Sequence, residues 1–323
     1  MPELMQAGDI AFPHLGIYLE NVPKSFTVFG LSIALYGCII ACGMIAGVCV
    51  AAREASLTGQ DPEKYWDFSL YAILLSVLGA RVYYVIFAWE YYKDDPLSVF
   101  NLRGGGLAIY GGVLTAFITA FVYTRLHRMP PLLFVDTGVQ GLLVGQIIGR
   151  WGNFTNREAF GQYTDGLFAM RLPVEAVRAA DISDSIRAHL SDTVNYIQVH
   201  PTFLYESLWN AGVFLSIQLY KRHKRFDGEI ALLYLGGYGL GRFLIESLRT
   251  DQLKLPHTQL PVSQLLAAAL FVLALTLDIA ARSGVLRGIA PLRGTQTEEL
   301  STSARCASSP SESMEAQEEP ERE

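Results

Sequence analysis

The chain has 323 residues, of which 51% are hydrophobic and only 17% charged, and its formal net charge at pH 7 is −6. Soluble domains carry about 25% charged residues, so an ordinary soluble domain is excluded. No basic face with interleaved aromatic residues is present, which excludes a nucleic-acid-binding protein. Apolar stretches of about 20 residues recur along the chain, and they predict a polytopic helical membrane protein.

Seven apolar stretches are long enough to cross about 30 Å of hydrocarbon at 1.5 Å per residue. The predicted spans are residues 27–51, 66–89, 106–124, 132–149, 203–220, 229–247 and 261–281. The expected fold class is therefore an all-α polytopic membrane protein, with about seven transmembrane helices and a small outer cap.

Lysine and arginine residues in the short loops predict the orientation of these spans. The basic residues that decide it are Arg125, Arg128, Lys221, Arg222, Lys224, Arg225, Arg282 and Arg287. If the spans alternate in direction, all of these residues lie on one side, and that side is the cytoplasm. The N-terminus is then outside, and the C-terminus is cytoplasmic.

The remaining segments divide into an outer part and a tail. The predicted domains are an outer N-terminal segment 1–26, a transmembrane catalytic domain 27–281 with an outer arm 90–105 and an outer cap 150–200, and an acidic tail 282–323. In the cap, residues 173–190 have helical spacing of apolar residues. In the arm, Tyr91, Tyr92 and Phe100 suit an interfacial aromatic belt. The tail is rich in Ser, Glu, Pro and Gln and is expected to be disordered.

The residues from Gly149 to Gly161 gather polar side chains directly after an apolar stretch. This segment contains two arginines, two asparagines and a glutamate among glycines and aromatic residues. Polar groups at the edge of an apolar solvent are costly and usually functional. The segment therefore predicts a site for an anionic lipid head group at the membrane boundary.

Two apolar stretches contain further charges. In the sixth, Arg242, Glu246 and Arg249 are spaced to share one helix face. A self-neutralised ion pair would leave Arg249 spare, so we favour a binding site. Arg81 in the second stretch either snorkels or pairs with carbonyl groups, or it has a functional role.

Other polar residues have structural interpretations as well. Tyr110 lies between glycine pairs that also suit a tight helix entry. His200 is interpreted as a cap or interfacial residue rather than a base, and Glu206 as a paired carboxylate. The cysteines of the first stretch lack histidine or acidic partners, so they are expected to be small apolar residues and no metal site is predicted.

Four segments together resemble the phosphatidylglycerol–prolipoprotein diacylglyceryl transferases, over about residues 20–281. Residues 149–161 fill every fixed position of the pattern Gly-Arg-x-Gly-Asn-Phe-x-Asn-x-Glu-x-x-Gly. The elements at 105–112, 200–206 and 239–246 add matches in the same order. The resemblance implies an enzyme of the bacterial cytoplasmic (inner) membrane, with its active site near the outer leaflet. It implies no metal and no organic cofactor.

The resemblance also implies the substrates and the roles of the site residues. A diacylglyceryl group would pass from phosphatidylglycerol to the lipobox cysteine in the signal peptide of a prolipoprotein, and glycerol 1-phosphate would leave. Arginine's planar donor fork suits the phosphate. Arg150 and Arg242 are expected to form a phosphate clamp. The other expected roles are head-group contacts from Asn153 and Asn156, positioning of the arginines by Glu158 and Glu246, a turn at Gly161 that lets the outer cap close over the site, and lipid contact or shaping of the cavity by Tyr36.

Tyr110 stands where some members of this family have a histidine. An unperturbed tyrosine, with a pKa of about 10, is a poor base near neutral pH. We therefore expect Tyr110 to orient the lipid by hydrogen bonding, and no residue is assigned as the general base.

Two other classes of protein fit part of the pattern. A transporter or flippase for anionic lipids also has intramembrane charges and glycine-rich helices, but the seven stretches show no internal repeat. A structural scaffold would leave the polar residues of the outer side unexplained. The product distinguishes the first two, because only a transferase releases glycerol phosphate.

Overall fold

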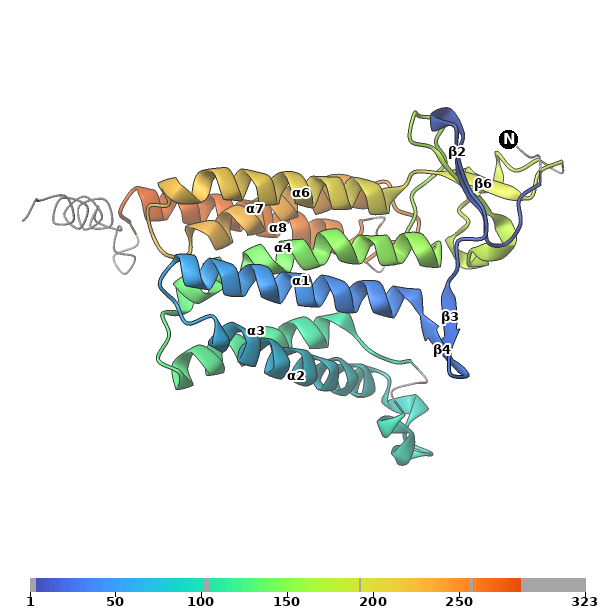
Figure 1. Ribbon diagram of the computed structural model, residues 1–323. Coiled ribbons are helices and arrows are strands. Elements are labelled where there is room, and N and C mark those ends of the chain that lie inside the picture. Colours follow the sequence, from blue (N-terminus) through green and yellow to red (C-terminus); the bar gives the residue numbers. More distant parts are fainter. Residues whose placement is uncertain (1–3, 102–104, 192, 256–257, 259, 286–323) are drawn as a thin grey trace, which may run out of the picture.

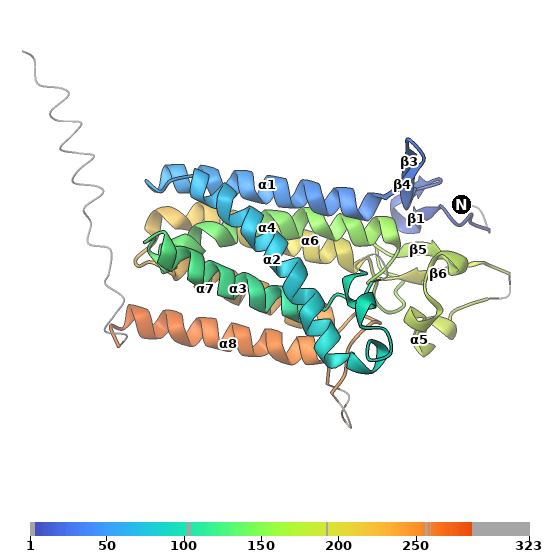
Figure 2. The same ribbon diagram turned by 90° about the horizontal axis from the view of Figure 1, so that it is seen from below.

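The computed structural model describes residues 4–285, except residues 102–104, 192, 256–257 and 259. Long helices lie side by side in a bundle, and short strands gather at one end of it (Figures 1 and 2). The tail predicted for residues 282–323 lies outside the described residues, apart from residues 282–285.

Seven helices in the described part of the chain have 18 residues or more. They are α1 (Leu35–Leu57), α2 (Glu63–Phe87), α3 (Ile109–Leu126), α4 (Pro131–Asn156), α6 (Thr202–Tyr220), α7 (Glu229–Glu246) and α8 (Val262–Arg282). The first four and α8 are long and apolar enough to cross a membrane. The protein is therefore a mainly helical membrane protein. Helices α6 and α7 are long enough as well, but they contain more polar residues.

The first predicted span, residues 27–51, is wrong at its N-terminal end. Helix α1 begins only at Leu35, and the preceding residues form a hairpin of strands β3 (Ser25–Val28) and β4 (Leu31–Ala34). At its turn, Phe29 and Gly30 have φ angles of 50° and 80°, which a right-handed helix does not allow. Aromatic and β-branched residues favour strands but are as apolar as helix formers, so hydropathy did not reveal this boundary.

The all-α prediction is also wrong for the cap, which is built on a sheet. Strands β1 (Ile10–Phe12), β2 (Ile17–Leu19), β5 (Met170–Pro173) and β6 (Tyr196–Val199) pair antiparallel in the order β2-β1-β5-β6. Along β6 the buried residues alternate with partly exposed ones, the period of two that a half-buried strand shows. The N-terminal segment and the outer cap therefore share one sheet.

The cap segment 173–190, expected to be helical, contains only short helical turns. They are η5 (Val174–Ala176), η6 (Ala179–Asp181) and α5 (Asp184–Arg187), and η1 (Pro13–Leu15) is a similar turn nearby. The apolar residues of the segment still pack on the cap core, where Ile186 is buried with Leu172 and Ile197. The spacing thus identified buried residues but not their conformation.

The arm between α2 and α3 is held by one arginine. Arg81 is buried, and its guanidinium donates hydrogen bonds of 2.7–3.1 Å to five arm carbonyls, those of Ser98, Val99, Asn101, Gly105 and Gly106. The arm includes η2 (Trp89–Tyr91) and η3 (Pro96–Phe100). Of the two interpretations of Arg81, the structure supports carbonyl pairing.

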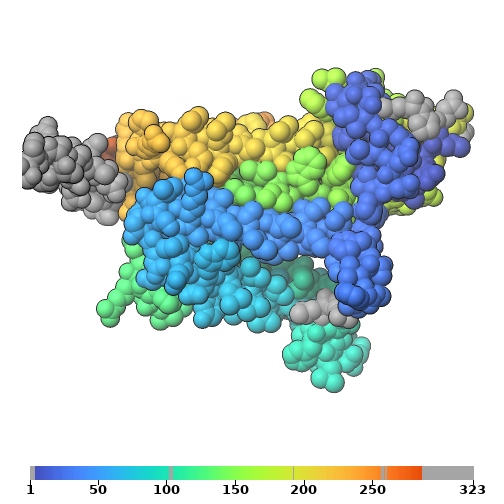
Figure 3. Space-filling view, viewed as in Figure 1, coloured from blue at the N-terminus to red at the C-terminus, as the bar shows by residue number. Residues whose placement is uncertain are grey.

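The aromatic belt predicted for the arm is only partly present. Tyr91 and Phe100 are exposed on the arm, which projects from the bundle in Figure 3. Tyr92 is buried instead, with its ring 5.2 Å from the Arg81 guanidinium carbon. A cation over an aromatic face is favourable, so Tyr92 belongs to the support of Arg81 and not to the belt.

Helices α1 and α4 pack closely because glycines face each other at their crossing. A Cβ atom placed on Gly47 would lie 2.6 Å from the Gly141 carbonyl oxygen, and one on Gly141 would lie 2.2 Å from the Gly47 oxygen. Glycine therefore allows backbone contact that no other residue permits, as in other membrane helix pairs. This contact fixes α4, the helix that carries Arg150, against α1.

Buried charge pairs lie at the end of the bundle opposite the cap. The Asp136 carboxylate of α4 accepts hydrogen bonds of 2.8 Å from the Gly228 and Ala231 backbone N–H groups, and its Oδ2 atom lies 2.8 Å from Lys224 Nζ. A carboxylate at a helix N-terminus satisfies free N–H donors, so Asp136 caps α7 from a neighbouring helix. The short helix η7 (Lys221–His223) lies just before this N-terminus of α7.

The glycine contact predicts a difference between two substitutions in the same helix. Gly141→Ala should destabilise the protein by about 1–3 kcal/mol, since overpacking costs that much. Gly138→Ala is the matched control, because a Cβ at Gly138 meets no atom within 4 Å. It should be neutral or stabilising, since alanine favours helix over glycine. Thermal unfolding in detergent measures both variants, and equal unfolding temperatures would contradict the packing argument.

Candidate functional site

Three helices, α4, α6 and α7, end around one buried carboxylate, that of Glu206 in the first turns of α6. Arg150 Nη2, from the last turns of α4, lies 2.5 Å from Glu206 Oε2. Arg242 Nη1, from α7, donates to both carboxylate oxygens at 3.2 Å. Arg249 Nη1, just beyond α7, lies 3.3 Å from Oε1. Glu206 thus joins three arginines that come from two separate parts of the chain, the end of α4 and the end of α7.

A second carboxylate, Glu246, supports the α7 side of this cluster. Its Oε2 atom lies 2.6 Å from Arg242 Nη2, one helical turn earlier. Ser263, in the first turn of α8, donates a hydrogen bond to Glu246 Oε1. The predicted role of Glu246 in positioning Arg242 is thus consistent with its contacts, and α8 contributes to that position.

Arg249 is held firmly by several acids. Its guanidinium donates to both oxygens of Asp251, at 2.9 and 2.7 Å. Burial acts to lower the pKa of Arg249, but Asp251, Glu206 and Glu246 raise it above its usual value. Burial acts to raise the pKa of Asp251, but the hydrogen bonds and charge of Arg249 keep that pKa below its usual value. Both groups are therefore charged at neutral pH.

The segment 149–161 begins as helix and ends as a junction. Arg150, Asn153 and Asn156 lie in the last two turns of α4, which extends beyond the predicted end at residue 149. Glu158 Oε1 accepts a hydrogen bond of 3.0 Å from Asn153 Nδ2. Glu158 was expected to position an arginine. Among the described residues it forms no ion pair, and it contacts the Asn153 amide instead.

Asn156 and Glu158 line a polar cavity of about 450 Å³ on the cap side. Lys24, Glu175 and Arg178 also line it, so both signs of charge are present. The cavity therefore connects the end of α4 with the N-terminal segment and the cap.

Arg157 faces the cap, although it occupies a variable position of the pattern. It is 2% exposed and donates to the carbonyl oxygens of Gly8 and Val22, at 2.5 and 2.6 Å. Arg157 and Ala159 have φ angles of 57° and 56°. Non-glycine residues in this region carry strain of about 1–3 kcal/mol and cluster at functional sites. The Arg157 contacts compensate by holding the N-terminal segment.

Gly161 lies where backbones approach closely, and its φ angle is not positive. Its N–H donates to the His200 carbonyl at 3.0 Å, and a Cβ atom here would lie 2.8 Å from both His200 Cβ and the Leu248 oxygen. The structure shows a close backbone approach at Gly161, in a bridge with Arg249, and the turn proposed there stays a prediction. Glycine is required because the segment passes between the start of α6 and the end of α7.

The two tyrosines of the predicted site differ in position. The Tyr36 ring packs on Gly152, two residues after Arg150 in α4. Tyr110 is 44% exposed in the first turn of α3, and no hydrogen bond joins it to another described residue. The structure therefore brings Tyr36 to the arginine cluster but does not bring Tyr110 into contact with it.

Sequence reasoning missed three residues of this arrangement as site members. They are Glu206, Arg249 and Arg157. The spare charge of Arg249 and the acidic residue of the 200–206 element were visible in the sequence, but their pairing depends on contacts between distant segments. Nothing in the sequence distinguished Arg157 from an ordinary surface arginine.

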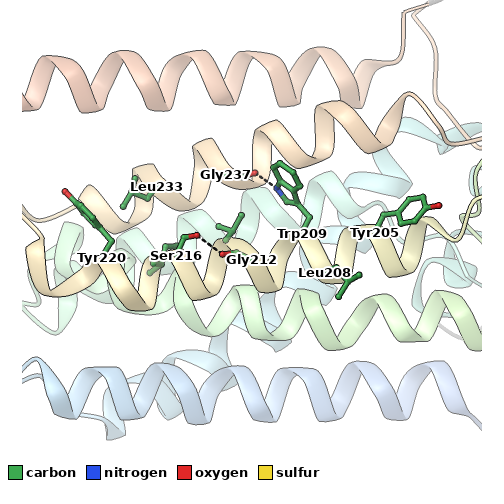
Figure 4. Close-up of a pocket in the computed structure, with 10 residues that line it drawn as sticks. Tyr205, Leu208, Trp209, Gly212, Ser216, Tyr220, Leu233 and Gly237 are labelled. Carbon is green, nitrogen blue, oxygen red and sulfur yellow. Dashed lines mark hydrogen bonds between the residues drawn. The ribbon is translucent and has the colours of Figure 1, made fainter. Parts of the chain in front are cut away.

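An apolar groove of about 920 Å³ runs along α6 and α7 from Tyr205, the neighbour of Glu206 (Figure 4). Its lining includes Leu208, Val213 and Leu233. Trp209 closes one wall, since its Nε1–H donates to the Gly237 oxygen at 2.8 Å. None of the described residues that line this groove is charged, so it suits an apolar chain and not the polar chemistry of the arginine cluster.

Comparison with known proteins identifies the family. Residues 23–280 match the family model for prolipoprotein diacylglyceryl transferase. The chain is 38% identical to the phosphatidylglycerol–prolipoprotein diacylglyceryl transferase of Clostridioides difficile, over 72% of this chain and 84% of that protein. It is 36% identical to that of Finegoldia magna, over 81% and 97%. It is 40% identical to that of Bacillus cytotoxicus, over 76% and 87%.

These matches cover the bundle, the arginine cluster and most of the cap, and they confirm the resemblance seen in the sequence. The chain belongs to the prolipoprotein diacylglyceryl transferase family.

Proposed function

We propose that Arg150 and Arg242 bind the phosphate of phosphatidylglycerol while its diacylglyceryl group passes to a prolipoprotein cysteine. Membership of the family supports this reaction. The observation that supports the site is the pair of guanidinium groups, from α4 and α7, on the single Glu206 carboxylate. Two cations held this close attract an anion, and planar donor forks suit a phosphate.

The chemistry explains why the cations matter. The cysteine sulfur attacks the glycerol carbon of the diacylglyceryl group, a carbon–sulfur bond forms, and the bond from that carbon to the phosphate oxygen breaks. The thiol proton is lost, and glycerol 1-phosphate leaves with the electron pair of the broken bond. Negative charge therefore grows on the phosphate, where fixed donors in a site of low dielectric constant stabilise it most.

Exposure distinguishes the clamp residues from the third arginine. The side chains of Arg150 and Arg242 are 21% and 18% exposed, whereas that of Arg249 is 10% exposed and bound to both oxygens of Asp251. Arg150 and Arg242 therefore keep donors available for a substrate. Arg249 supports the cluster by balancing Glu206 and Glu246.

Neighbouring groups suit the remaining parts of the lipid. In this proposal Asn153 and Asn156 contact the glycerol head group, Glu158 orients Asn153, and Tyr36 shapes the cavity beside them. The apolar groove that begins at Tyr205 has room for an acyl chain beside Glu206. The acceptor is then the lipobox cysteine of a signal peptide, whose apolar region lies in the same membrane.

We further propose that α6 and α7 also cross the membrane, which makes seven spans. Helix α6 packs against α4 and α7, and α7 packs against α4, α6 and α8, so both run within the bundle (Figures 1 and 2). The basic residues near the ends of α3, α6 and α8 gather at the end opposite the arginine cluster, and this favours a cytoplasmic location for that end. The N-terminus and the site then face outward in the bacterial cytoplasmic membrane.

Replacement of Arg150 tests the clamp. Arg150→Ala should reduce diacylglyceryl transfer to a lipobox peptide by about 100-fold to 1,000-fold, the usual effect of losing one transition-state donor. Folding should be retained, because Glu206 keeps Arg242 and Arg249 as partners. The mass shift of the peptide and the release of glycerol phosphate measure the reaction in purified enzyme.

The matched control is Arg53→Ala, an exposed arginine near the far end of α1, which should leave transfer unchanged. Near-normal turnover of a folded Arg150→Ala enzyme would refute the clamp.

Tyr110 is proposed to orient the lipid and not to act as the base. Its exposure and its lack of contact with the arginine cluster support this role. Tyr110→Phe should therefore lower transfer by about threefold to tenfold, since one hydrogen bond contributes about 0.5–1.5 kcal/mol. Loss of a general base would cost about 100-fold to 10,000-fold. Initial rates at saturating peptide separate the two cases, and a loss in the larger range would assign the base to Tyr110.

His200 is proposed to be structural and neutral at pH 7. Its ring Nδ1 lies 3.3 Å from the Tyr205 hydroxyl, and its backbone holds Gly161. Burial lowers the pKa of His200 below the ordinary value of 6.5. The unfolded chain therefore binds this proton more readily, so the stability due to neutral His200 is present above pH 6.5 and is lost as the pH falls through the lowered pKa.

This linkage predicts an acid-dependent loss of stability. The unfolding temperature of the enzyme in detergent should fall between pH 7.5 and pH 5.5, and His200→Gln should reduce that fall, because glutamine does not titrate. His189→Gln, at an exposed position of the cap, should not change it. If the His200→Gln enzyme lost as much stability in acid as the parent, another group would be responsible.

A further inference from the structure

The hairpin before α1 has one apolar face and one face of small residues. Its register pairs Phe26 with Ile33 and Val28 with Leu31, whereas Thr27 pairs with Ser32. Directly paired residues point to the same face of a sheet. The four large apolar side chains therefore share one face, and the other face carries Ser25, Thr27, Ser32 and Ala34.

The apolar face is uncovered in the part of the chain that the structure describes. Leu31 is 71% exposed and Phe29, at the tip, is fully exposed. Phe26, Val28 and Ile33 also remain exposed. A two-stranded hairpin is marginally stable in water by itself, and a contiguous exposed apolar surface marks an interaction site. The hairpin therefore needs a partner for this face.

The place of the hairpin in the chain indicates what that partner is. Strand β4 ends at Ala34, and α1 begins at the next residue. At 1.5 Å per residue the 23 residues of α1 extend about 34 Å, slightly more than the about 30 Å of the hydrocarbon core. The hairpin thus begins where α1 reaches the boundary between hydrocarbon and head groups.

The charge pattern agrees with that depth. No charged residue occurs between Lys24 and Arg53, so the apolar surface of α1 continues into the hairpin without interruption. A surface for a soluble protein partner would carry a polar rim, whereas the hairpin sequence itself contains no charged residue. The hydroxyls of the opposite face suit water or head groups.

We propose that the hairpin Ser25–Ala34 lies in the lipid interface, with Phe26, Val28, Leu31 and Ile33 toward the acyl chains and Phe29 as its deepest anchor. The projecting arm with Tyr91 and Phe100 lies at the same end of the molecule (Figure 3). The two elements hold the end that carries the arginine cluster at the membrane boundary. This inference concerns lipid contact and does not depend on the proposed phosphate clamp.

Neighbouring residues on opposite faces of β3 provide the test. In the full-length chain with its four cysteines replaced by alanine, a nitroxide label is attached to Val28→Cys or to Thr27→Cys. The protein is reconstituted in phosphatidylglycerol-containing vesicles. Collision of the label with oxygen, which dissolves in hydrocarbon, is compared with collision with a water-soluble nickel complex. A label at Ala188→Cys, at an exposed position of the cap, gives the aqueous reference.

The label at Val28 should collide several-fold more with oxygen, and several-fold less with nickel, than the label at Thr27. Equal nickel access at Val28, Thr27 and Ala188 would refute the interfacial position. Magnetic coupling between labels of two chains would show instead that the face binds a second copy. Protection of Val28 only after addition of a lipobox peptide would assign the face to the acceptor. Each labelled enzyme must retain diacylglyceryl transfer, which excludes misfolding as the cause.

Discussion

The shared carboxylate of Glu206 is the interaction on which the rest of the site depends. Glu206 is 4% exposed, and an isolated charge at such a position in a membrane bundle would be very costly. Arg150, Arg242 and Arg249 provide the compensation, and they come from α4, α7 and the segment after α7. The same pairs that neutralise Glu206 therefore fix the relative positions of three helix ends.

This arrangement also leaves capacity for a substrate. Each arginine has five N–H donors, and each carboxylate accepts about four hydrogen bonds. The three arginines thus offer more donors than Glu206, Glu246 and Asp251 can accept, although the formal charges of the six groups cancel. An added phosphate oxygen can bind donors already in position, so little reorganisation is required when charge develops on it.

The sequence predicted the helices after the first span to within three residues at each end, except that α4 extends seven residues beyond its predicted end. The apolar length of these stretches exceeds that of most core helices. The prediction failed at residues 27–34, where strand and helix are equally apolar, and in the cap, where β1 and β5 pair across about 160 residues of chain. The motif identified Arg150 and Asn153, which lie one turn apart in α4, as site residues. It assigned Glu158 to the arginines, whereas Glu158 contacts Asn153. It did not predict Glu206 as the centre, since that role arises only when α4, α6 and α7 meet.

The segment from Arg150 to Gly161 couples the cap to the arginine cluster. Its helical part points Arg150 at Glu206, its variable Arg157 binds the N-terminal segment, and Gly161 fits between α6 and the end of α7. The left-handed residues Arg157 and Ala159 lie on either side of Glu158, so the chain direction there is set by both neighbours. The contacts of Arg157 with the N-terminal segment therefore lie directly beside the hydrogen bond between Glu158 and Asn153. The hydrogen bonds of Arg157 to the N-terminal segment and that of Glu158 to Asn153 therefore belong to one continuous segment, which begins at Arg150.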